Sequence, residues 1–354
     1  MAIRRSHILT SRRRCDEILR HLSARPRPCG RRQSVQRRLQ SAGQDRASGP
    51  AGKGAIVALQ RSAAAPVVRL PSTPIVVDAA ADREFERVAR EAGFDPDSRW
   101  IGGFVDEVWC RGRHVFESWG FGLADRRVLE FGCNVGATAI VLALLGARPV
   151  AIEPDPDYLS VARANATRYG VGDRIRFVQV PDSAGLPFRD ATFDLVSCAA
   201  VLEYVQAHRL PEVQREIDRV VRPGGIILVS GTSNRLWPRE LLSRRWFINY
   251  VPRSIDGYLP TSRPLQRGVF PWRVRYGFGR YENLDRVNRG RAYLMARQRM
   301  YPGRLSRLGF AAANAVALSC GTTLGLVTPT ICVALKKLGD GGAASVASTL
   351  QFDE

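Results

Sequence analysis

The middle of the chain alternates short apolar runs with amphipathic segments, and this alternation predicts its fold. Apolar runs, each of strand length, occupy 127–132, 149–153, 174–180, 193–198 and 226–231. Segments with helical spacing of apolar residues lie between them at 137–146, 155–170 and 210–221. A parallel strand is apolar along its length because both faces of the sheet are covered. This order predicts βαβ units, whose right-handed crossovers give an α/β fold with a doubly wound parallel sheet and helices on both faces.

Helical spacing also occurs before this core, and a less regular pattern follows it. Residues 80–93 and 104–118 carry apolar positions at helical spacing, so 76–124 is predicted to be a helical N-terminal cap. The core itself is assigned to 125–232. Prolines, aromatics and arginines crowd residues 233–305, with helical spacing near 283–298. We interpret 233–305 as a basic lid, inserted before the closing strands of the core.

Residues 308–335 carry no charge, and this run has two interpretations. Its length is sufficient for a membrane-spanning helix. Threonine, asparagine and glycine residues and Pro329 lower its hydropathy and interrupt it, so we favour two closing strands of the core within 306–337. The last of these strands is predicted at 330–337. Residues 338–354 are expected to form a flexible tail.

The charge of the chain is unevenly distributed. The chain has 354 residues, 53 basic against 33 acidic side chains and a net charge of +20, and arginine supplies 50 of the basic residues. Residues 1–75 carry +13, 76–234 carry −5, 235–337 carry +15 and the remaining tail −3. The predicted core is therefore mildly acidic and lies between two basic flanks. GC-rich coding is an alternative explanation of the arginine bias.

Residues 1–75 are rich in arginine, serine and alanine, and we interpret them as a disordered basic N-terminal extension. The segment lacks the apolar stretch of a secretory signal. An organellar targeting segment and an arm that binds nucleic acid or a membrane surface are the alternatives. Seven cysteines without a CxxC pair and four scattered histidines predict a reducing, cytoplasmic environment and no structural metal.

The strongest chemical signal lies where the first apolar run ends, at Glu130-Phe131-Gly132-Cys133-Asn134-Val135-Gly136. Glycine lets the backbone turn sharply and approach a ligand, and asparagine tolerates the left-handed conformation better than most residues. The turn opens a helix, whose free N–H groups attract polar groups of a ligand. This pattern predicts a ligand site at the carboxyl end of the first strand.

An acid at the end of the second strand, Glu153, is placed to accept the two ribose hydroxyls of a nucleoside. A helix-dipole role for Glu153 is the less favoured alternative. The turn lacks the second glycine that a dinucleotide pyrophosphate requires, and Glu130 would repel a phosphate. A carboxylate attracts an ammonium group, so S-adenosylmethionine (SAM) fits better than NAD.

Five segments, in order, resemble the successive motifs of class I SAM-dependent methyltransferases. The nearest branch is the type-11 group, which includes ubiquinone and menaquinone methylases. The resemblance covers about residues 125–235 and implies a Rossmann-like methyltransferase sheet, SAM as the cofactor and a transferase activity. The segments are VLEFGCNVG (128–136), AIEPD (151–155), PDSAGLPFRDATFDLV (181–196), VLEYV (201–205) and RVVRPGGIILVS (219–230).

The resemblance implies a set of cofactor-binding residues. The first motif would hold the methionine part of SAM, the acid after the second strand the ribose, and the acid before the LPF turn the adenine amino group. The end of the fourth strand would face the methionine part. These assignments fall on Glu130, Gly132, Cys133, Asn134, Gly136, Glu153, Pro154, Asp155, Asp182, Ser183, Cys198 and Ala199. The family often has histidine where this chain has Tyr204, so a role for that histidine is not carried over.

The acceptor site is expected outside the five motifs, from the helical cap and from the segment after the fifth strand. The catalytic candidates are His114, Tyr204 and Asn234, and the substrate-binding candidates are Trp109, Arg235 and Trp237. Packing, surface and core roles are the alternatives for His114, Tyr204 and Cys198. Arginine matches phosphate and carboxylate groups, so an anionic acceptor is one hypothesis and arginines on a solvated lid are the other.

The acceptor class therefore stays open between a small molecule, a lipid and a glycan. A nucleic acid reached through the basic flanks is a less favoured acceptor, and peripheral contact with a membrane is a further alternative. A SAM-binding module without catalytic activity is the competing function. Neither the acceptor atom nor the oligomeric state follows from the sequence.

Overall fold

The computed structural model describes residues 79–241, 243–259 and 265–339, which belong to one unit of the chain. The predictions for residues 1–75, and for all but two residues of the expected tail at 338–354, lie outside the described residues. The described cap contains α3 (Ala79–Glu91), α4 (Phe104–Glu107), the π-helical turn η1 (Val108–Gly112) and α5 (Arg113–Ser118). The two helices expected in the cap are therefore present, and the second is divided.

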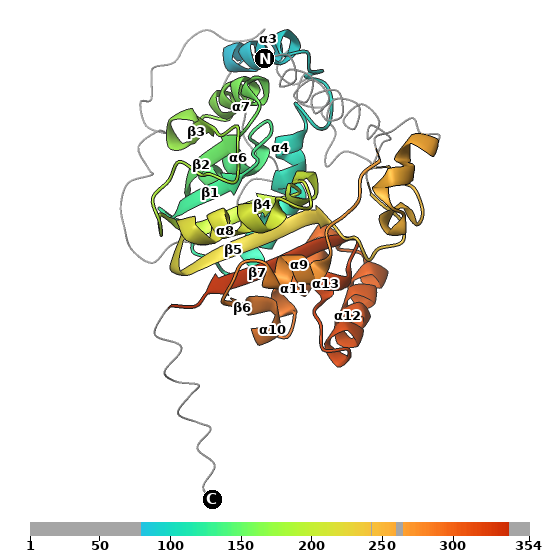
Figure 1. The fold of residues 1–354 in the computed structure, drawn as a ribbon. Helices are drawn as coiled ribbons and strands as arrows, with labels where there is room; N and C mark the ends of the chain where they lie inside the picture. The colour runs from blue at the N-terminus through green and yellow to red at the C-terminus, as the bar shows by residue number, and fades with distance from the viewer. Residues whose placement is uncertain (1–78, 242, 260–264, 340–354) are drawn as a thin grey trace, which may run out of the picture. The chain divides into compact units, whose positions relative to one another are not determined.

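Seven strands form one mixed sheet in the order β3-β2-β1-β4-β5-β7-β6 (Figure 1). β1 to β5 are parallel, and β7 runs antiparallel to both β5 and β6. The doubly wound parallel core is confirmed, and an antiparallel edge extends it. The strands are β1 (Arg127–Phe131), β2 (Arg148–Glu153), β3 (Arg176–Gln179), β4 (Phe193–Ala199), β5 (Val221–Ser233), β6 (Tyr281–Asn283) and β7 (Thr330–Lys337).

Helices cover both faces of the sheet because successive side chains of each strand point to opposite sides. On β5, Ile227 and Val229 join one buried cluster, which includes residues of α8, while Leu228 joins another, which includes residues of α5, α6 and α11. The remaining helices and turns are α6 (Ala137–Leu144), α7 (Pro156–Arg168), η2 (Gly172–Arg174), η3 (Leu202–Tyr204), α8 (Leu210–Val220), η4 (Ile248–Tyr250), η5 (Arg253–Tyr258), α9 (Pro271–Tyr276), α10 (Leu284–Val287), α11 (Arg291–Met300), α12 (Arg304–Ser319) and α13 (Leu324–Val327).

Of the two closing strands expected within 306–337, the last is confirmed and the first is wrong. Residues 330–337 form β7 as predicted, but the preceding stretch forms α12 and α13. An uncharged run carries no strand periodicity of its own, and the five alanines of α12 favour a helix. None of the described helices has the length and apolar character that a membrane crossing requires.

The region predicted to be a separate lid, 233–305, contributes directly to the core. β6 pairs with β7 at the sheet edge, and α11 packs its buried residues Tyr293 and Ala296 into the cluster beneath α5 and α6. The helix expected near 283–298 is divided into α10 and α11. Gly290, with φ of 72°, separates the two helices because its left-handed conformation ends a regular helix.

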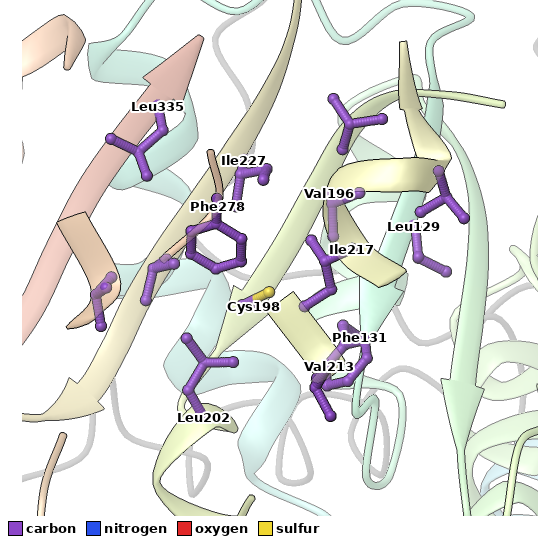
Figure 2. Packing of buried hydrophobic residues seen from close by; sticks show 14 of the residues in the cluster. Leu129, Phe131, Val196, Cys198, Leu202, Val213, Ile217, Ile227, Phe278 and Leu335 are labelled. Carbon is purple, nitrogen blue, oxygen red and sulfur yellow. The ribbon is translucent and has the colours of Figure 1, made fainter. Parts of the chain in front are cut away.

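Replacing Ile217 by alanine is expected to destabilise the protein by about 2–5 kcal/mol. Ile217 of α8 is fully buried and lies beside Val196 and Cys198 of β4 (Figure 2). Urea denaturation would measure the loss. Leu305→Ala, at a side chain that is 86% exposed, is the control and should change stability by less than about 0.5 kcal/mol. Equal losses in the two variants would contradict this packing.

Candidate functional site

The turn between β1 and α6 has three residues in the left-handed region. Gly132, Asn134 and Gly136 have φ values of 75°, 50° and 79°. A Cβ atom at Gly132 would clash with the Val201 side chain, and one at Gly136 would press on Ala162 of α7. The turn therefore requires glycine at both positions, and it holds the backbone close to the carboxyl ends of β1 and β4.

Glu153 joins this turn to the end of β2. Its carboxylate accepts a hydrogen bond of 2.9 Å from the Asn134 N–H, and the N–H groups of Gly132 and Cys133 donate to Ile152 O. Burial raises the pKa of Glu153 to about 7. Two neighbouring strand ends are thus tied together through the turn.

Glu130 lies below the turn and is almost completely buried. Its Oε2 atom has no hydrogen-bond partner among the described residues, and burial raises the pKa of its carboxyl group to about 8. The Ser197 and Thr138 hydroxyls beside Glu130 offset only part of this effect, and a buried carboxylate stays unfavourable unless a further donor or a cation reaches it. This orphaned oxygen fits the ammonium group of SAM, in agreement with the reasoning from sequence.

Two cavities meet at Glu153. A larger one of about 940 Å³ lies over the turn and extends to the cap and α11, and a smaller one of about 240 Å³ lies beside β2 and the loop after β3. Gly132, Glu153, Pro154 and Tyr204 line both. A nucleoside with an amino-acid tail has two parts of this kind, so the paired cavities fit SAM with its ribose at Glu153.

The structure brings most of the expected cofactor residues to these cavities. The residues that line one or both are Glu130, Gly132, Cys133, Asn134, Glu153, Pro154, Ser183 and Ala199. Four others line neither. Gly136 begins α6, Asp155 caps α7 by accepting from Asp157 N–H, and Cys198 points into the apolar cluster under α8. The alternation of β4 therefore puts Ala199, and not Cys198, at the site.

Asp182 is placed differently from its expected role at the adenine. Its carboxylate accepts from the Ala184 N–H at 3.0 Å and from Arg209 at 2.7 Å, and these contacts hold its pKa below the usual range. The carboxylate is thus engaged beside the smaller cavity, which Ser183 and Arg209 line. Arg209 was not singled out from the sequence, because nothing in its helix-start context marks it as a ligand.

The acceptor candidates from the cap line neither cavity. Trp109 is buried with the Arg113 guanidinium 4.8 Å from its ring centre. His114 Nδ1 lies 3.0 Å from Glu117 Oε2, on the side of the helix. Both residues were candidates because residues 125–235 contain no obvious base. The structure places Trp109 in the packed interior and the partly buried His114 beside Glu117.

The cap residues that line the larger cavity form one stripe along the helix, which includes Val108, Gly112 and Phe116, and Trp109 and His114 lie off that stripe. Arg111, Trp100 and Phe104 line the larger cavity from this region. The cap contributes to the candidate acceptor site as expected, but through other side chains.

The candidates after β5 are also displaced from the cavities. Asn234 is buried, and its side chain donates to Leu326 O and Thr328 O, so it braces the backbone. Arg235 lies 4.9 Å from the Phe270 ring and donates to a backbone carbonyl, and Trp237 lies on the surface. None of the three lines a described cavity.

Other charged residues take their place at the larger cavity. Glu203 is buried, and one of its oxygens accepts from Ser233 N–H while Oε2 has no partner in the described part of the chain. Burial raises the pKa of Glu203 to about 7. Arg253 and Arg297 also line this cavity. Of these three residues, only Glu203 lies within one of the five sequence motifs, VLEYV (201–205). No group of three metal-ligating side chains occurs within the described ranges.

Comparison with known proteins identifies the family to which this chain belongs. The methyltransferase-domain model matches residues 129–229. A ubiquinone biosynthesis O-methyltransferase of Pectobacterium atrosepticum is 30% identical over 181 residues, covering 48% of this chain and 72% of that protein. A ribosomal protein L11 methyltransferase of Pseudomonas aeruginosa is 39% identical over 111 residues (31% and 34%). A sterol 4-C-methyltransferase of Caenorhabditis elegans is 31% identical over 101 residues (28% and 29%).

The chain thus spans about a third of the length of the last two relatives. The three relatives are methyltransferases of ubiquinone biosynthesis, of ribosomal protein L11 and of sterols. What these proteins share with this chain is the domain, and their acceptors differ.

Replacing Gly132 by alanine is expected to weaken SAM binding by about tenfold or more, because the left-handed conformation strains a residue with a Cβ atom. The added methyl group would also displace Val201 from the cavity wall. Isothermal titration calorimetry with SAM measures the change. Gly122→Ala is the matched control, because its added Cβ meets no atom within 4 Å. Unchanged affinity in Gly132→Ala would remove the turn from the site.

Replacing Glu130 by glutamine is expected to stabilise the cofactor-free protein at pH 8. The pKa of Glu130 rises from an ordinary 4.5 to about 8 on folding, so between these values the folded chain holds a proton that the unfolded chain has released. The free energy of unfolding therefore falls as the pH rises through this window. Melting temperatures at pH 6 and pH 8 should show a smaller drop for Glu130→Gln than for the wild type.

The opposite sign is expected for Glu216→Gln. The Arg219 guanidinium, 2.8 Å away, lowers the pKa of Glu216, so its ionised form stabilises the fold at neutral and higher pH. Glu216→Gln should therefore melt at a lower temperature than the wild type at pH 8. If both variants were destabilised at pH 8, the buried Glu130 carboxylate would not be the unfavourable charge inferred here.

Proposed function

The chain belongs to the class I SAM-dependent methyltransferases, and we propose that it transfers a methyl group from SAM to an amphipathic acceptor that carries an anionic group. The observation that supports this most directly is the pair of cavities joined at Glu153, with the orphaned Glu130 carboxylate beside one of them. The smaller cavity would receive the adenine. The larger one would receive the methionine part and the acceptor.

The residues present fit the cofactor. Glu130 would bind the ammonium group, Glu153 the ribose hydroxyls, and the backbone at Gly132–Asn134 would lie against the methionine part. Pro154, Val180 and Pro181 offer flat apolar contacts to a base in the smaller cavity. When bound, SAM supplies an electrophilic methyl carbon on a sulfonium. The contribution of the chain is to hold the acceptor in line with that carbon and to exclude water.

Glu203 is the group in the larger cavity best suited to accept a proton. It is buried, one of its oxygens is unpaired, and its raised pKa of about 7 matches the requirement for a base near neutral pH. The Ser233 N–H fixes its orientation through Oε1. An acceptor hydroxyl or amine would lose its proton to Glu203 as the methyl group is transferred.

The larger cavity has an apolar wall and a cationic side. The Arg297 guanidinium is enclosed by three aromatic rings, at 4.7 Å from Phe310, 4.8 Å from Tyr301 and 6.0 Å from Tyr293. Its buried Nε has no hydrogen-bond partner among the described residues. A held guanidinium with an unused donor fits a phosphate or carboxylate. Arg297 therefore replaces Arg235 as the candidate anion-binding residue.

Label transfer from methyl-labelled SAM, in a cell extract, tests the proposal. We expect label in the organic-soluble fraction, and a loss of about tenfold in Arg297→Gln, which removes a charge-assisted contact. Arg299→Gln, two residues away and half-exposed, is the matched control and should keep wild-type transfer. Calorimetry with SAM should give equal affinities for all three proteins.

Three outcomes would contradict parts of this function. An absence of binding heat with SAM would leave a module of another kind. SAM binding without any labelled product would support a non-catalytic module. Label that nuclease releases would identify a nucleic acid as the acceptor and would overturn the amphipathic class.

A further inference from the structure

An exposed group of apolar side chains follows β5, in the segment drawn in yellow to orange in Figure 1. We call Leu236, Trp246, Phe247 and Tyr250 the aromatic platform. Their side chains are 46%, 61%, 60% and 51% exposed. The Phe247 ring centre lies 6.1 Å from that of Trp246 and 6.3 Å from that of Tyr250, and the Tyr250 hydroxyl donates to Leu236 O. These residues therefore form one contiguous surface and not scattered exposures.

Buried polar side chains beneath the platform hold it in its exposed position. Glu240 is fully buried and accepts from Ser243 N–H, and Asn249, also buried, donates to Trp237 O and accepts from Gly268 N–H. Buried side chains that use their polar atoms in this way fix a loop conformation. The exposure of the rings is thus a property of the folded segment.

The backbone supports the same conclusion. Phe247 has φ of 63°, in the left-handed region that a bulky residue rarely adopts. In this conformation the ring points away from the core while Ile248 and Asn249 next to it are buried. The local geometry favours presentation of the ring over its burial.

The charges around the platform are all of one sign. Arg239 and Arg244 are exposed and Arg245 is partly exposed, and the Arg239 guanidinium lies 5.9 Å from the Trp246 ring centre. The acids of the same stretch are used elsewhere, since Glu240 is buried and Asp256 pairs with Arg267. A surface of indole, phenyl and phenol rings with arginines complements the interface of a membrane that contains anionic lipids.

The platform is continuous with the larger cavity. Leu241 and Arg253 belong to the same segment and line that cavity, so one segment of the chain carries the platform and part of the cavity lining. A molecule lying in a membrane interface beneath the platform would meet the cavity without crossing bulk water.

We propose that the aromatic platform docks the protein on a membrane surface that carries anionic lipids. The rings insert at the headgroup level, and the arginines around them contact phosphates. The docking proposal depends only on this surface and not on the proposed function. The corollary that the membrane supplies a lipid acceptor to the cavity rests on the proposed function.

Sedimentation with vesicles tests the docking on the full chain. Binding should be stronger to phosphatidylcholine vesicles that contain phosphatidylglycerol than to phosphatidylcholine alone. Trp246→Ser combined with Phe247→Ser should weaken binding to both at least about tenfold, because two apolar side chains no longer leave water. Arg239→Glu with Arg244→Glu should remove about fivefold per arginine, and only with the anionic vesicles.

The arginine-rich residues 1–75 also attract anionic lipids, so the comparison is made between variants that all retain them. Tyr276→Ala is the matched control, since Tyr276 is an exposed aromatic residue (71%) on α9 with Arg275 beside it. It should bind vesicles as the wild type does. A loss in Tyr276→Ala equal to that in the double serine variant would overturn the assignment to the platform.

Quenching of Trp246 fluorescence by brominated lipids distinguishes docking through the platform from a general loss of vesicle affinity. Brominated lipids should quench the fluorescence of Trp246 in the bound protein, and Trp246→Phe should keep vesicle binding while losing that quenching component. Unchanged quenching in Trp246→Phe would overturn the proposal. So would a double serine variant that binds vesicles normally but has lost binding of single-stranded RNA or self-association.

Calorimetry with SAM keeps this test independent of the proposed function. The platform variants should bind SAM with wild-type affinity, because none of the changed residues lines a cavity. If vesicle binding failed and SAM binding held, the docking alone would be wrong. If vesicle binding held and SAM binding were absent in every protein, the docking would stand and the proposed function would fall.

Discussion

The turn after β1 constrains everything that the candidate site does. Its left-handed residues bring the backbone within contact distance of Val201, which follows β4, while its Asn134 N–H is bonded to Glu153 at the end of β2. Three central strands are therefore fixed relative to one another at their carboxyl ends. Parallel strands in a doubly wound sheet leave a crevice at this edge. The turn converts that crevice into two cavities with a shared wall.

The same arrangement concentrates three carboxyl groups in a buried place. Glu130, Glu153 and Glu203 are all held where burial raises the pKa of each. Without a ligand, ionising these groups opposes folding above pH 5 or so. A cationic ligand that reaches Glu130 relieves this cost, so cofactor binding and stability are linked through the same carboxylates. Strain of this kind is expected at a functional site and not in a structural core.

The sequence predicted the parallel core because its signal is local. Each strand from β1 to β5 is an apolar run, and the glycine pattern at Gly132 and Gly136 depends only on backbone conformation, so both can be read without tertiary information. What failed depends on packing. Cys198 and Ala199 are adjacent, and only the pleat decides which one faces the site. Trp109 and His114 belong to a helix that was predicted, but tertiary packing decides which face of that helix lines the cavity. α12 replaced an expected strand because an uncharged run has no strand periodicity.

The arginine bias also has a partly structural explanation. Arg267 is buried in an ion pair with Asp256, and the Arg235 guanidinium lies 4.9 Å from the Phe270 ring centre. A planar guanidinium stacks on aromatic faces in a way that lysine does not. The net charge of residues 235–337 therefore overstates their anion-binding surface. The arginines able to meet an anion are those that line the larger cavity, Arg253 and Arg297, and those around the aromatic platform.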